Sequence, residues 1–166
     1  MPYDPIAAVE FETMVFTRHN SDLTGRPRRS SGILNHSAYL LLNVLQTAGP
    51  QTIAELSEIT RLTVSTLTRQ TASLTAAGYA EHILDPSGTP ARKLRITTTG
   101  LEALAEERAI TRSLMREIMS EWSAEECEAF AAMLRKLNND IEKRSGSPWP
   151  RPSDEMVRAA KAAAGE

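Results

Sequence analysis

Residues 52–78 read TIAELSEITRLTVSTLTRQTASLTAAG, a stretch with two helix-start signals close together. Thr52 followed by Glu55 matches a capping box, in which each side chain bonds the other residue's backbone N–H. Thr63 is a second candidate N-cap, and Gly78 follows the next apolar run, where a helix commonly ends. Two short helices joined by a tight turn predict a helix-turn-helix.

The flanking segments predict further helices and one β-hairpin. The expected elements are helices over 5–23 and from Asn35 to Gly49, strands over 79–84 and 93–98 around a turn at 85–90, and long helices from Thr99 and from Ser123 onward. We therefore expect a mainly α fold with a small β-hairpin wing. In this fold a winged helix-turn-helix is embedded in a helical dimerisation frame.

The length of 166 residues suits one domain with its own core and is short for two. We expect four segments along the chain. They are an N-terminal dimerisation helix and linker (1–33), the winged helix-turn-helix (34–100), the C-terminal dimerisation helices (101–144), and a tail with one loosely attached short helix (145–166).

Composition and cysteine content exclude several classes of protein. No apolar run approaches the ~20 residues of a membrane span, and the acidic, proline-containing start does not match a secretory signal, so we expect a cytoplasmic protein without a membrane partner. The single cysteine, Cys127, excludes a disulfide scaffold, and the three histidines lack metal-ligand spacing. Because no phosphate loop or nucleophile–base pattern occurs either, we expect no catalytic residues, no metal, no cofactor and no enzyme activity.

Charge is divided unevenly along a chain whose net charge is −2. Residues 61–100 hold five basic and two acidic residues, whereas residues 101–144 hold seven basic and ten acidic residues. A basic middle beside an acidic helical region favours a DNA-contacting segment on a scaffold that does not touch DNA.

The helix expected from Val64 to Ala77 has one apolar and one polar face. Val64, Leu67 and Leu74 form the expected inward stripe, and the helix carries no Asp or Glu. Arginine pairs with two acceptors of guanine and glutamine pairs with adenine, so the polar face suits a DNA groove. An ordinary solvated helix face is the alternative interpretation.

The first and last helices indicate a second subunit. In residues 5–23 the apolar side chains point in nearly all directions, which a second copy of the chain satisfies more easily than the chain's own fold. In the helix after Ser123, apolar residues recur at helical spacing and are expected to be buried. The expected dimer interface comprises Ile6, Val9, Phe11, Met14, Phe16, Phe130, Met133, Leu134, Leu137 and Ile141.

Residues 34–104 resemble the MarR (multiple antibiotic resistance regulator) family of winged helix-turn-helix regulators. The resemblance lies in Leu34-Asn35, Thr52 with Glu55-Leu56, Ser65-Thr66-Leu67-Thr68-Arg69 with Leu74 and Gly78, Asp85-Pro86, and Leu94-Arg95-Ile96-Thr97-Thr98-Thr99-Gly100. It implies a homodimer that binds double-stranded DNA at a pseudo-palindromic site, with the helix at 63–77 of each protomer in a major groove. Most relatives are repressors that a small-molecule ligand releases from DNA.

The expected DNA-binding residues are Thr52, Thr63, Ser65, Thr66, Thr68, Arg69, Gln70 and Ser73 in the motif, and Arg92, Lys93 and Arg95 in the wing. The chain departs from the family pattern at Gly88-Thr89-Pro90, where a wing arginine is usual, so Arg92 or Lys93 must take its place. It also has Arg61 at a turn position where glycine is common, and Thr71 where an aliphatic residue is usual.

The resemblance further implies a small aromatic or phenolic effector. Phe16, His19, His36 and Tyr39 are the residues expected near such a site, and core packing with a hydrogen-bonded imidazole is the alternative for each. Two other functions stay open. One is a winged-helix protein-interaction (anti-repressor) module, and the other is a redox-sensing or metal-sensing regulator of the same fold.

Overall fold

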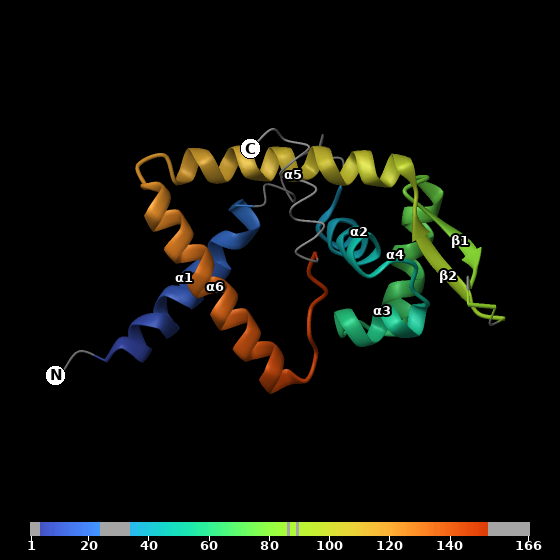
Figure 1. Cartoon of the computed structure of the whole chain (residues 1–166), viewed down its shortest axis with the longest axis horizontal. Coiled ribbons are helices and arrows are strands. Elements are labelled where there is room, and N and C mark those ends of the chain that lie inside the picture. The colour runs from blue at the N-terminus through green and yellow to red at the C-terminus, as the bar shows by residue number, and fades with distance from the viewer. Residues whose placement is uncertain (1–3, 24–33, 86, 89, 153–166) are drawn as a thin grey trace.

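The computed structural model describes residues 4–23, 34–85, 87–88 and 90–152. Its elements are α1 (Pro5–Leu23), α2 (His36–Ala48), α3 (Ile53–Thr60), α4 (Val64–Ala76), β1 (Ala80–Leu84), β2 (Arg92–Ile96), α5 (Thr98–Ile118) and α6 (Ala124–Ser145). Helix α5 spans the molecule (Figure 1). A compact head of α2, α3, α4 and the hairpin lies at one end of it, and α1 and α6 lie toward the other. We call these the head and the frame.

Side-chain caps start five of the helices, because an oxygen accepts a backbone N–H that the first turn leaves unpaired. The capping residues are Asn35, Thr52, Thr63, Thr97 and Ser123. Thr52 and Ser123 form complete capping boxes with Glu55 and Glu126. The predicted starts of α2, α3, α4 and α6 are therefore confirmed.

The boundary between the hairpin and α5 differs from the prediction. We expected the second strand to continue to Thr98, whereas β2 ends at Ile96 and Thr97 is the N-cap of α5. The Thr97 hydroxyl also donates to the Gly78 carbonyl at 2.6 Å. The run of threonines therefore belongs to the helix start.

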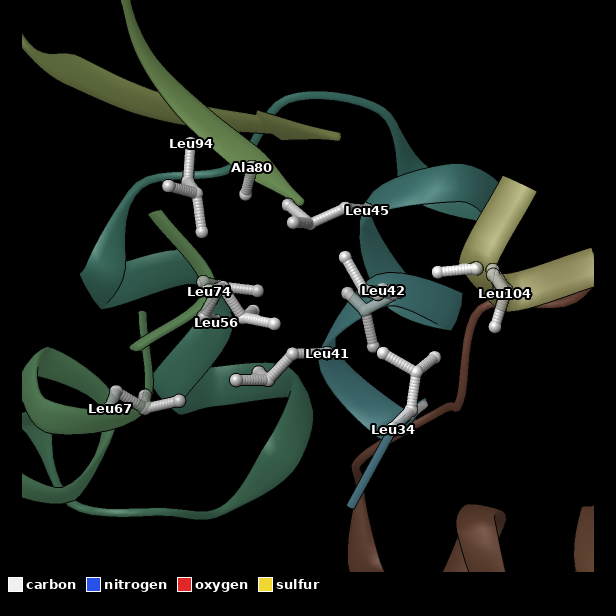
Figure 2. Close-up of a cluster of buried hydrophobic side chains, with 12 residues drawn as sticks. Leu34, Leu41, Leu42, Leu45, Leu56, Leu67, Leu74, Ala80, Leu94 and Leu104 are labelled. Carbon is white, nitrogen blue, oxygen red and sulfur yellow. The ribbon is translucent and has the colours of Figure 1, made fainter. Parts of the chain in front are cut away.

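The core of the head is a cluster of leucines centred on α2 (Figure 2). Leu41, Leu42 and Leu45 of α2 are almost completely buried. Around them lie Leu56 of α3, Leu67 and Leu74 of α4, Ala80 and Leu94 of the hairpin, and Leu104 of α5. This cluster holds α4 by one face and leaves its other face exposed.

Two residues of α4 are not where the periodicity places them. Val64, expected to face inward, is 56% exposed, because it is the first residue of α4 and the buried stripe begins one turn later at Leu67. Thr71 takes the aliphatic position in the stripe and is buried. Its hydroxyl donates to the Leu67 carbonyl at 2.8 Å, which satisfies the polar group inside the core.

The hairpin is tied to the rest of the head on two sides. β1 and β2 are antiparallel, with Ala80 opposite Ile96, and Leu94 forms an additional bridge with Gln51 ahead of α3. At the other side, a Cβ on Gly100 would lie 2.1 Å from the Tyr79 carbonyl oxygen, so only glycine fits there. The wing therefore has a fixed position relative to α3 and α5.

The frame leaves apolar side chains uncovered within one chain. We expected α6 to bury its stripe, but Phe130, Met133, Leu137 and Ile141 are exposed and Leu134 is half-buried. The reason is that α6 turns away from α5 after Ser123, so no element of the described chain covers the stripe. None of the helices in the described segments is long and apolar enough to cross a membrane.

Candidate nucleic-acid interface

The start of α4 carries a cluster of hydroxyl groups. Thr63 Oγ1 lies 2.9 Å from Thr66 Oγ1 and 3.1 Å from Ser65 Oγ, and it also accepts the backbone N–H of Thr66. Thr63 and Ser65 are exposed and Thr66 is half-buried. The helix N-terminus adds a partial positive charge, so this end of α4 is suited to bind anionic groups.

Further along α4, the exposed face carries Thr68, Arg69 and Ser73. The Thr68 hydroxyl donates to the Val64 carbonyl at 2.8 Å, and the Ser73 hydroxyl donates to the Arg69 carbonyl at 3.2 Å. The Arg69 side chain has no ion pair among the described residues. Its guanidinium therefore projects from the helix with donors available for a ligand.

Gln70 lies differently from its neighbours. Its Nε2 donates to Ser37 Oγ of α2 at 3.0 Å, and its Oε1 is buried without a hydrogen-bond partner in the described chain. A cleft of about 460 Å³ separates the start of α2 from α4 here, and Asn35 and Arg69 also line it. Gln70 thus packs toward α2 in this conformation, and its expected base contact stays a prediction.

The three basic residues of the wing have different surroundings. Lys93 Nζ lies 3.7 Å from Glu55 and 3.6 Å from Asp85, so it joins the wing to the start of α3. Arg95 forms an ion pair with Glu81 across the hairpin at 2.6 Å. Arg92 is exposed at the start of β2, without an ion pair in the described segments. Of the three, Arg92 is the best placed to contact a ligand.

Thr52 and Glu55 act at the same corner of the head. Thr52 Oγ1 accepts the Glu55 N–H at 3.2 Å, and Glu55 Oε2 accepts the Thr52 N–H at 2.7 Å. The Thr52 backbone N–H holds the pKa of Glu55 below its ordinary value, partial burial opposes this, and Lys93 lowers the pKa further. The corner between α3 and the wing therefore contains a carboxylate that is ionised at neutral pH.

The four residues expected at an effector site do not line the cleft beside Gln70. Phe16 and His19 are exposed on α1, His36 is exposed at the start of α2, and Tyr39 packs against the leucine core. Nor do three metal-ligating side chains come together anywhere in the described segments. The effector site stays a prediction.

Several residues outside the predicted site make contacts between distant segments. Arg61 Nη2 donates to the Ser145 carbonyl at 2.9 Å, Ser147 Oγ donates to the Glu58 carbonyl at 3.3 Å, and Trp149 packs against the core. Arg108 of α5 donates to Asn43 of α2. The one signal in the sequence was Arg61 at a position where glycine is common; its φ is +59°.

Comparison with known proteins gives three findings. The model of the MarR family matches residues 34–89. The chain is 33% identical over 135 residues to the uncharacterized HTH-type transcriptional regulator YxaD of Bacillus subtilis. The aligned residues cover 81% of this chain and 94% of that protein. Among solved structures, a MarR family protein from Bacillus stearothermophilus is similar with a TM-score of 0.67 and 21% identity, covering 84% of this chain and 98% of that one.

A second solved structure contains bound DNA. It is a mutant of MarR from Escherichia coli complexed with operator DNA, and it is similar with a TM-score of 0.60 and 16% identity. The similarity covers 82% of this chain and 98% of that one. At this level of identity the likeness concerns the fold.

Proposed function

Because the chain belongs to the MarR family of transcriptional regulators, we propose that it binds a pseudo-palindromic DNA duplex as a homodimer, with α4 of each protomer in a major groove. The exposed face of α4 carries this proposal. It combines an outward arginine with hydroxyl groups and contains no carboxylate that would repel phosphates. The structure of the relative bound to operator DNA supports the same use of the fold.

Arg69 and Arg92 are assigned different parts of the interface. Arg69 projects from the middle of α4, where an arginine can donate two hydrogen bonds to guanine O6 and N7. Arg92 lies on the wing, from which side chains reach phosphates or the minor groove. Lys93 and Arg95 hold carboxylates of their own chain, so their contribution to DNA binding is smaller.

The exposed apolar residues of α1 and α6 support a homodimer. Phe11 and Met14 of α1, and Met133 and Ile141 of α6, are all more than half exposed within one chain. We propose that a second copy covers them and that the two copies of α4 lie on one side of the dimer. A two-fold symmetric protein then matches a two-fold symmetric duplex.

We propose that an effector acts through the same arrangement. The molecule is small and aromatic or phenolic, and it binds more tightly to a dimer whose two α4 helices have a different separation. It weakens DNA binding by the difference between its affinities for the two shapes of the dimer. We propose that the protein is a repressor that is released from its operator in this way.

The test begins with selection of a duplex from randomised DNA by the full chain. The selected and a scrambled duplex are then titrated at several salt concentrations with wild type, Arg69→Ala and Arg92→Ala. For Arg69→Ala we expect a loss of about 1–3 kcal/mol on the selected duplex and a loss of preference at one base pair. Arg92→Ala should weaken both duplexes alike and reduce the salt slope by about one.

Arg135→Ala is the matched control, because it removes an exposed arginine from α6 and should change neither value. Equal weakening of both duplexes by Arg69→Ala would show that Arg69 binds phosphate. If wild type selects no duplex at all, the proposal is wrong and a protein-interaction role takes its place.

A further inference from the structure

The last described segment returns from the frame to the head. Helix α6 ends at Ser145, and Gly146, with φ +66°, reverses the chain direction. Residues 145–151, which we call the strap, then run back beside α3 (Figure 1). Helix α5, α6 and the strap thus connect the head to the frame and back again.

The strap is hydrogen-bonded to the end of α3. Arg61 Nη2 donates to the Ser145 carbonyl at 2.9 Å, and Ser147 Oγ donates to the Glu58 carbonyl at 3.3 Å. The first bond joins the residue after α3 to the last residue of α6, and the second joins the strap to α3 itself.

Two further side chains fix the strap itself. Trp149 packs against the leucine core, so the strap is attached to the head by apolar contact as well. Arg151 donates to both carboxylate oxygens of Glu142, at 2.8 and 2.6 Å, which ties the strap to the last turns of α6. A bidentate pair of this kind restrains direction as well as distance.

Arg61 occupies its position at a conformational cost. It is the one non-glycine residue with positive φ in the described chain, a backbone conformation that is unfavourable for an L-residue. Glycine would remove the cost but would also remove the guanidinium that reaches Ser145. Strain that persists beside a specific contact points to a role for the side chain.

We infer that the strap, through Arg61 and Trp149, sets the orientation of the head relative to the dimer frame and so selects the half-site spacing that the homodimer accepts. Among the described residues, the long helix α5 leads from the head to α6, and the strap adds a second connection. With it, the turn of the motif and the end of α6 are fixed to each other. Arg61 and Trp149 are then positioning residues, and this inference rests on the proposed function.

The experiment uses the full chain and derivatives of the selected duplex with one base pair inserted or removed between half-sites. Each change moves a half-site by roughly 3.4 Å and turns it by roughly 34° around the duplex. For wild type we expect each change to weaken binding by about tenfold or more, and for Arg61→Gly and Trp149→Ala by only about threefold, because a less rigid head adapts to the altered site.

Thermal unfolding separates positioning from stability. Arg61→Gly should unfold at the same or a higher temperature than wild type, because it relieves the positive φ, while its spacing preference falls. Arg61→Lys, which retains a donor for Ser145, should recover part of that preference. Arg135→Ala is again the control, and it should keep the wild-type ratio between binding to the duplexes with altered and with original spacing.

A second measurement needs no DNA. Spin labels on an Ala72→Cys, Cys127→Ser variant report the distance between the two α4 helices of a dimer, and the distribution should broaden when Arg61→Gly is added. The inference would be overturned if the variants weakened binding to all duplexes alike, so that the ratio between altered and original spacing stayed as in wild type. An unchanged distance distribution would also overturn it. Failure of wild type to select any duplex would overturn the proposed function, while the spin-label distances would still test the strap.

Discussion

Val64 is an apolar residue in the first turn of α4, where a recognition helix contacts base edges. The helical period places it on the same side as Leu67, yet its side chain is 56% exposed, because packing on the core begins one turn later. Periodicity indicates which face of a helix is apolar, but the position at which a neighbour begins to cover that face depends on the tertiary fold. The exposure of Val64 could therefore not be predicted from the sequence alone.

If α4 lies in a major groove, the Val64 methyl groups are placed to contact the C5-methyl of a thymine. We expect one thymine-to-deoxyuracil replacement in the selected duplex to weaken wild-type binding by about 1 kcal/mol, the value of roughly one buried methyl group. Val64→Ala should bind both duplexes equally, and the difference is measured by titration. Leu84→Ala removes an exposed side chain from the wing and should still bind the uracil-containing duplex more weakly, as wild type does. If Val64→Ala also binds that duplex more weakly, Val64 does not contact the thymine methyl group.

Helices and their caps show most clearly which structure can be predicted from sequence. A cap depends on residues within one turn of each other, so Asn35, Thr52 and Ser123 were identifiable without any tertiary information. Contacts between elements were not. Gln70 bonds Ser37, 33 positions earlier, and Arg61 bonds Ser145, 84 positions later, and neither pair has a local pattern that links its members.

The corner between α3 and the wing predicts a pH-dependent stability. The pKa of Glu55 is lowered in the folded protein, so its contribution is present above the ordinary value of 4.5 and is lost as the pH falls through the folded value. We expect Glu55→Ala to lower the free energy of unfolding by about 1 kcal/mol at pH 7, the usual contribution of a hydrogen bond. Below pH 4.5 the difference from wild type should shrink, as measured by urea unfolding.

Glu58→Ala provides the comparison for this measurement, because it removes an exposed carboxylate from the same helix without touching the capping box. Its stability should follow that of wild type across the pH range. A loss for Glu55→Ala that stays constant down to pH 3 would mean that the ionised carboxylate is not its source.

At the level of the whole molecule, large apolar residues of α1 and α6 are exposed in one chain. The apolar residues of both helices were recognisable from sequence. Those of α1 were expected to be covered by a second copy, and those of α6 were expected to be buried within the chain as well as across a dimer. The direction of α6 after Ser123 determines the outcome, and no local signal encodes that direction. The expected interface is therefore a prediction for the assembled dimer.

Met133→Glu tests that prediction, since Met133 is 66% exposed in one chain and central in the stripe of α6. In a two-fold interface each substitution occurs twice, so we expect the dimer dissociation constant in sedimentation experiments to rise by at least about tenfold. Leu84 on the wing is even more exposed than Met133, and Leu84→Glu should leave self-association unchanged. Equal behaviour of the two variants would move the interface away from α6.

The hydroxyl groups of Thr68 and Ser73 have a consequence for which bases α4 can distinguish. In this conformation each hydroxyl donates its proton to a carbonyl of its own helix, so it presents lone pairs toward a ligand. If α4 lies in a major groove as proposed, the exocyclic amino groups of adenine and cytosine are the donors from which such lone pairs can accept a hydrogen bond. We therefore expect these two positions to favour A or C over G or T on the strand that they face.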